Sequence, residues 1–174
     1  MKPTKKLTLS ALLSALGVVM ISVGAIFELF DLSILAFVSL FVAFAYIELG
    51  SPYTFLVWIV TSLLSFILFP GAVMWIEYFA VFGIYPILKG YIERLGRLFW
   101  WPLKILYASL SVILLIFAVE FITGTPFFTF DATLLKVGIC VLLIFAFALY
   151  DVFLTVLIRY YMRALRPRIK TLLK

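Results

Sequence analysis

The sequence lacks histidine and contains a single cysteine, Cys140, among its 174 residues. One cysteine excludes an intrachain disulfide, and the absence of histidine excludes the mixed Cys/His clusters that hold structural zinc. No phosphate-binding loop and no nucleophile with a neighbouring base is present, so the usual constellations of an active site are missing. We therefore expect no cofactor, no metal and no catalysis.

Charge is also scarce, and apolar residues take its place. Only 13% of the residues are charged, 67% are apolar and the mean hydropathy is +1.28. Soluble chains are about half apolar and about a quarter charged. A surface with this excess of apolar side chains suits a lipid bilayer, so the composition predicts one membrane domain over residues 1–174.

Six apolar segments divide this domain. They cover residues 7–27, 32–49, 53–69, 72–88, 103–122 and 133–158. Pro70 and Gly71 indicate a turn between the third and fourth segments, although one long helix from Tyr53 onward is an alternative. Pro86 predicts a kink in the fourth segment, and Pro102 suits the first turn of the fifth. Apolar residues at helical spacing predict a short interfacial helix over residues 90–101.

The basic residues orient these segments, because lysine and arginine near helix ends stay in the cytoplasm. With six crossings both tails share one side, and 13 of the 14 basic residues fall there, whereas a five-span arrangement would export one basic tail. The thirteen are Lys2, Lys5, Lys6, Lys89, Arg94, Arg97, Lys104, Arg159, Arg163, Arg166, Arg168, Lys170 and Lys174. We therefore predict an all-α membrane protein with six transmembrane helices and both termini cytoplasmic, where the basic tail meets anionic lipid.

Acidic and aromatic residues gather at the opposite ends of the segments. Carboxylates together with aromatic rings are typical of a site for a cationic, neutral or aromatic small molecule. Glu77 and Glu120 are the strongest candidates, because both lie inside the ends of apolar segments, where an ionised group is costly. The alternative is an interfacial aromatic belt with solvated acids. The predicted substrate-binding residues are Glu28, Asp31, Trp75, Glu77, Tyr78, Glu120, Phe128 and Asp131.

Two further acids lie toward the cytoplasmic side. Asp151 is inside the last segment, and we expect it to pair with a basic residue there. Glu48 closes the second segment, and the sequence leaves open whether it caps the next helix or binds a partner.

Small residues are dense in the first segment. Ala11 and Ala15 are one turn apart and therefore share a face, on which another helix can approach closely. That helix belongs either to the same chain or to a separate membrane subunit, and the sequence alone does not decide between them.

Six short spans, a basic N-terminal tail and the run KKLTLSALLSALG over residues 5–17 resemble the substrate-binding S components of energy-coupling factor transporters. In that family the first helix carries an A-x-x-x-A pattern, which Ala11 and Ala15 match. The resemblance implies capture of a vitamin-like micronutrient at the outer face of a bacterial plasma membrane. It also implies docking through the first helix on a transmembrane scaffold subunit that cytoplasmic ATPases drive.

The main alternative is a membrane protein without a transport role, which handles lipid or scaffolds a membrane complex. The basic and aromatic residues of segment 91–101 and of the C-terminal tail favour it. An enzyme is disfavoured, because Glu77, Glu120 and Asp151 would have to act without histidine, metal or nucleophile. No nucleic acid partner is expected.

Overall fold

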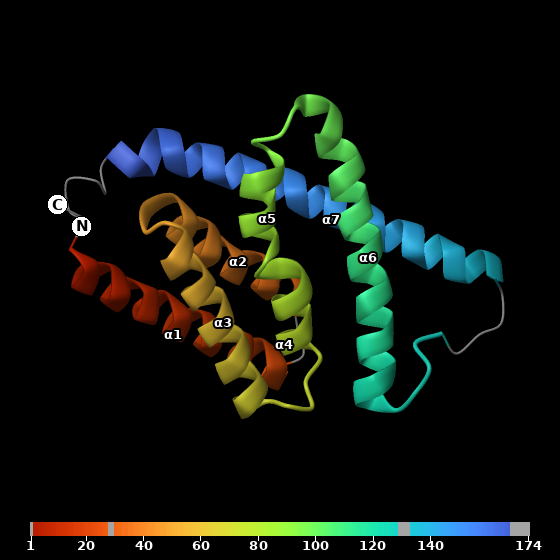
Figure 1. The fold of residues 1–174 in the computed structure, drawn as a ribbon. Coiled ribbons are helices and arrows are strands. Elements are labelled where there is room, and N and C mark those ends of the chain that lie inside the picture. The colour runs from red at the N-terminus through yellow and green to blue at the C-terminus, as the bar shows by residue number, and fades with distance from the viewer. Residues whose placement is uncertain (1, 28–29, 129–132, 168–174) are drawn as a thin grey trace.

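The computed structural model describes residues 2–27, 30–128 and 133–167, and they form helices joined by short connections, with no strand in these ranges. The elements η1 and η2 are π-helices. In chain order the elements are α1 (Pro3–Phe27), α2 (Asp31–Glu48), α3 (Ser51–Leu68), α4 (Met74–Glu77), η1 (Tyr78–Phe82), α5 (Tyr85–Ile92), α6 (Arg97–Thr123), α7 (Thr133–Tyr160) and η2 (Tyr161–Leu165) (Figure 1).

Five of these helices, α1, α2, α3, α6 and α7, are long and apolar enough to cross a membrane. The prediction of an all-helical, multi-pass membrane protein is therefore supported by the structure. The predicted fourth span, over residues 72–88, is divided among α4, η1 and α5. A sixth crossing, through this broken segment, stays a prediction.

The fourth segment breaks for a local reason. Pro86 has no N–H to donate, and its ring crowds the carbonyl of Phe82, four residues earlier. The turn before it is widened, because the N–H of Gly83 donates to the carbonyl of Tyr78 over 2.6 Å. A Cβ atom at Gly83 would lie 2.6 Å from the ring of Trp58 and 2.8 Å from that carbonyl oxygen. The break predicted at Pro86 is thus present, and it lies in the turn before that proline, in η1.

Helices α1, α2 and α3 pack closely around small side chains. A Cβ atom at Gly17 would lie 3.1 Å from Thr61 Cγ2 and 3.2 Å from Val38 Cγ1, so the α1 backbone approaches both neighbours at this point. Val42 and Val57 beside them are fully buried. Without a hydrophobic force between helices in lipid, such close approach supplies the dispersion contacts that hold them together.

Contacts gather the start of α1, the α2–α3 turn, the end of α5 and η2 at one end of the molecule, which we call the basic end. Lys6 Nζ donates to the carbonyl of Leu49 over 3.0 Å, and the Tyr46 and Tyr91 rings meet edge to face. Arg166 Nε donates to Glu48 over 2.7 Å, and no side chain caps α3, so of the two roles left open for Glu48 only the binding of a partner stays a prediction. The start of α1 and the end of η2 therefore both contact the α2–α3 turn.

Helices α6 and α7 stand apart from this bundle. In Figure 1, α6 runs alongside α4 and α5, and α7 crosses behind α5 and α6. The buried share of the most apolar window falls from 39% in α1 to 22% in α6 and 17% in α7. Segment 90–101, predicted as an interfacial helix, is divided among the end of α5, a turn and the start of α6. Because α6 begins at Arg97, Pro102 lies inside it and not in its first turn.

Candidate functional site

The end opposite the basic end gathers the α1 C-terminus, the α2 N-terminus, α4 and the C-terminal part of α6, and we call it the acidic end. A Cβ atom at Gly24 would lie 2.6 Å from Met74 and 3.1 Å from Ile34, so α1, α2 and α4 meet here. Asp31 begins α2, Glu77 ends α4, and Glu120 lies in the last turn of α6. The predicted clustering of acids near this end therefore holds for these three residues.

Glu120 lines an open cleft of about 690 Å³ between α4–η1 and α6. Its Oε1 accepts a hydrogen bond of 3.1 Å from the backbone N–H of Phe127, which fixes the carboxylate against the chain that follows α6. The other lining residues are apolar or aromatic: Ile76, Phe79, Ala80, Leu114, Phe117, Ala118 and Phe121. One carboxylate among aromatic rings in a cleft of this size suits a small cation or a flat aromatic molecule.

Asp31, Glu77 and Tyr78 form a second group beside this cleft. Helix α2, which begins at Asp31, contacts α4, which ends at Glu77. Tyr78, next in the chain, is fully buried, and its hydroxyl has no hydrogen-bond partner among the described residues. Tyr78 is therefore part of the core, and Ile76 and Phe79, on either side of this pair, reach the cleft instead.

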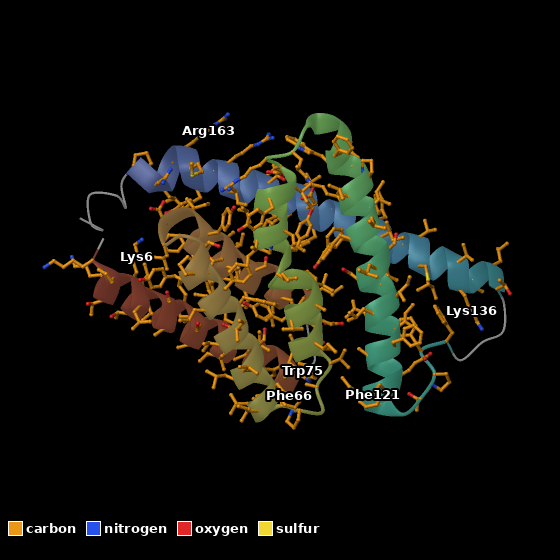
Figure 2. The ribbon with its side chains drawn as sticks, in the orientation of Figure 1. Lys6, Phe66, Trp75, Phe121, Lys136 and Arg163 are labelled. Atoms are coloured by element: carbon orange, nitrogen blue, oxygen red, sulfur yellow. The ribbon has the colours of Figure 1, made fainter. Side chains whose placement is uncertain are left out.

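The remaining predicted residues are dispersed. The Trp75 ring packs on Phe66 at 4.7 Å, and its indole N–H donates to the carbonyl of Pro70 over 3.3 Å, so it braces the α3–α4 connection (Figure 2). Phe128 packs edge to face on Phe127, with Lys136 Nζ 5.9 Å from its centroid. Glu28 and Asp131 lie outside the described residues. Among the described members of the predicted set, Glu120 is the one that lines the cleft.

The two alanines of the first helix point away from the chain's own core. Ser14 and Gly17 are buried in α1, whereas Ala11 and Ala15 are exposed. The small residues of α1 therefore form two faces: one packs on α2 and α3, and the alanine face is open along the outside of the bundle.

The structure contains a buried cluster of charges, and only its aspartate was expected from the sequence. Asp151 of α7 accepts hydrogen bonds from Lys89 of α5, from Tyr85 over 2.6 Å and from Lys104 of α6 over 2.8 Å. Glu93 completes the cluster at 2.8 Å from Lys89 and 3.3 Å from Lys104. Lys89 is only 2% exposed and Asp151 7%. Two cations and two anions thus balance each other where α5, α6 and α7 meet, as predicted for Asp151.

Side chains also satisfy the carbonyl groups around the break in the fourth segment. The Tyr107 hydroxyl donates to the carbonyl of Ala80 over 2.6 Å, and the Tyr150 hydroxyl donates to that of Phe82 over 3.3 Å. The Trp58 indole donates to the carbonyl of Phe79 over 3.0 Å. Irregular backbone at membrane depth needs such partners, because lipid offers none. Sequence reasoning missed this role, although Pro86 was the signal that carbonyls would be released.

A second cavity of about 400 Å³ lies between α2, η1, α6 and α7. Its lining is almost wholly apolar, with Ser33 and Ser111 as the small polar exceptions. Phe82 and Tyr150 belong to this lining, and the Tyr150 ring also packs on Tyr85, which donates to Asp151 of the charge cluster. Nothing in this lining would orient an ionic ligand, so an apolar chain or ring suits it best.

No three acidic or cysteine side chains converge into a metal site within the described part of the chain. Comparison with known proteins adds no identity: no family model, no curated protein and no solved structure matches this sequence. The class that the fold itself defines is a multi-pass α-helical membrane protein with an aromatic, singly acidic cleft at one end.

Proposed function

We propose that this protein is the substrate-capturing subunit of a micronutrient uptake transporter. The observation that carries the proposal is the 690 Å³ cleft at the acidic end, where Glu120 is the single carboxylate among aromatic and aliphatic side chains. In the proposed topology six segments cross a bacterial plasma membrane, both termini are cytoplasmic, and the cleft opens on the outer side. Its substrate is a small cationic or aromatic solute with a vitamin-like size.

The exposed alanine face of α1 supports the second half of the proposal, docking on a membrane scaffold that cytoplasmic ATPases drive. Ala11 and Ala15 leave space for the close approach of a foreign helix, and no helix within the described residues covers them. The proposal assigns the supply of energy for uptake to these partners.

The substrate is tested by mass spectrometry of small molecules released from the full chain after purification in a mild detergent. We expect a retained solute that is lost in Glu120→Gln, because the neutral amide no longer attracts a cation. Glu48→Gln, at the basic end, is the matched control and should retain it. The proposal would be contradicted if the Glu120→Gln variant retained the solute, or if the wild-type protein released no solute.

Docking is tested by co-purification from native membranes. Ala11→Trp and Ala15→Trp should each abolish association with a scaffold and its ATPases, because the indole fills the space for the partner helix. Leu63→Trp, on the lipid-facing side of α3 where Leu63 is 55% exposed, is the control and should leave association unchanged. Association that survives both alanine substitutions would exclude docking through this face.

The second cavity favours another function, which is handling of lipid or of a lipid-like molecule. Its nearly wholly apolar lining between α2, α6 and α7 would hold an acyl or prenyl chain better than a soluble solute. The released-ligand experiment separates the two functions: a polar solute supports uptake, whereas a lipid that is retained in Glu120→Gln and lost in Ala36→Trp, which fills the second cavity, supports the alternative.

A further inference from the structure

A third hollow lies at the basic end, away from the cleft and the cavity described above. It is a groove of about 490 Å³ between α1, α2, α7 and η2, with a nearly entirely apolar lining. Leu9 and Leu13 of α1, Leu40, Phe41 and Phe44 of α2 and Leu165 of η2 are among the residues that line it.

Cations stand at the mouth of this groove. Lys5 lies one helical turn before Leu9, which itself lies one turn before Leu13, so all three share the groove face of α1. Lys2 is a further turn outward, and both lysines are exposed. Neither makes an ion pair with a carboxylate in the described part of the chain, whereas Arg166, across the mouth, already pairs with Glu48.

Other cations at the basic end have other partners or point away from the groove. Lys6 is occupied by the carbonyl of Leu49 and by the Tyr53 ring, 5.5 Å away. Arg159 and Arg163 are exposed and have no carboxylate partner among the described residues, and the label in Figure 2 places Arg163 on the far side of η2 from Lys6. Arg94 lies over the rings of Tyr46 and Tyr91. Among the described residues, Lys2 and Lys5 are therefore the cations on the groove side that have no carboxylate partner.

An occupant must combine an apolar chain with a negatively charged end. The lining of the groove is nearly wholly apolar, and Lys2 and Lys5, which precede its α1 wall in the chain, are two exposed cations. We propose that this groove is a binding site for one anionic phospholipid, whose acyl chain lies between α1, α2 and α7 and whose phosphate meets Lys2 and Lys5. The site is independent of the solute and of the alanine face.

The full chain in mild detergent, incubated with equal amounts of phosphatidylglycerol and phosphatidylcholine of identical acyl chains, tests this site by native mass spectrometry. We expect one phosphatidylglycerol to be retained in preference to phosphatidylcholine. The double variant Lys2→Gln/Lys5→Gln should bind phosphatidylglycerol about 30-fold more weakly, which corresponds to about 1 kcal/mol for each cation near an anionic headgroup. Glycerol 3-phosphate should not displace the lipid, because it lacks the chain.

Two further variants separate the groove from general surface charge. Arg159→Gln/Arg163→Gln removes the same charge from the same end and should leave the preference intact. Leu40→Trp fills the groove and should abolish retention, whereas Leu64→Trp, on an exposed face of α3, should not. Equal retention of the two lipids by the wild type would overturn the proposal, as would equal loss in the arginine and lysine double variants or displacement by glycerol 3-phosphate.

Discussion

Helices α1–α3 and helices α5–α7 are held together by different forces. In the first group the backbones approach closely over Gly17 and bury aliphatic side chains. In the second, α6 and α7 bury much less of their surface and reach the rest of the chain through Asp151, Lys104 and the hydroxyls of Tyr107 and Tyr150. Lipid tails are as apolar as leucine, so in a membrane shape and polar contacts decide which helices stay together.

This comparison indicates that one group should respond to changes of volume and the other to changes of charge. Substitutions with matched controls test whether packing holds α1–α3 and polar contacts hold α5–α7. Stability is measured throughout as the free energy of unfolding, from circular dichroism of the full chain in one detergent.

The largest effect is expected from Asp151→Ala. It leaves Lys89 buried without its closest anion, and breaking a buried pair from one side costs about 3–5 kcal/mol. Asp151→Leu/Lys89→Met removes both charges and should cost distinctly less.

The position of α7 in Asp151→Ala is measured by spin labels. Cys140, the only cysteine, carries one label and a cysteine introduced at Leu63 carries the other, so that the α7–α3 distance is measured. An unchanged distance distribution in Asp151→Ala would show that the cluster does not hold α7 in place.

Gly17→Val should come next, at about 1–3 kcal/mol, because its side chain would press on Thr61 and Val38, which already lie 3.1–3.2 Å from the Cβ position. Gly138→Val on α7 is the matched control. No atom lies within 4 Å of a Cβ there, so we expect no loss. Equal destabilisation by the two variants would contradict the view that only α1–α3 is packed to its limit.

Tyr107→Phe should cost about 1–2 kcal/mol. It deprives the carbonyl of Ala80 of a 2.6 Å hydrogen bond at a depth where water is scarce. Tyr53→Phe is the control, since no hydrogen bond of the Tyr53 hydroxyl is present in the described chain. A loss as small as that of Tyr53→Phe would mean that the freed carbonyl finds another partner.

The smallest effect is expected from Arg166→Gln, at about 0.5–1 kcal/mol. Arg166 is one-third exposed where it meets Glu48, so water and salt already weaken the pair. The loss should shrink when the ionic strength rises from about 0.01 M to 1 M, because the screening length falls from about 30 Å to 3 Å. A loss that does not depend on salt would indicate packing and not charge as its origin.

Hydropathy and proline placement predicted much of the fold from the sequence. The turn at Pro70, the break near Pro86 and the five long apolar helices are local consequences of composition, so they needed no knowledge of packing. The start of α6 was missed, because Pro102 suits a first turn but is also tolerated inside a helix that lipid and neighbouring helices support.

The site was less predictable, because it depends on which helices become neighbours. Glu77 and Glu120 have the same sequence signal, yet only Glu120 reaches the cleft. An interior partner for Asp151 was expected, but the sequence could not indicate Lys89 and Lys104, 62 and 47 residues away. The burial of Tyr78 and the exposure of Ala11 likewise follow from helix rotation, which composition does not set.

The balance of charge in the Asp151 cluster has an electrical consequence. A membrane potential exerts force only on net charge, at about 2.3 kcal/mol per elementary charge for each 100 mV crossed. Because two lysines face two carboxylates, the cluster itself carries no net charge, and it adds nothing to the response of α5, α6 and α7 to a membrane potential. Replacing Asp151 with a neutral residue would give the junction a positive charge and make its position sensitive to the potential.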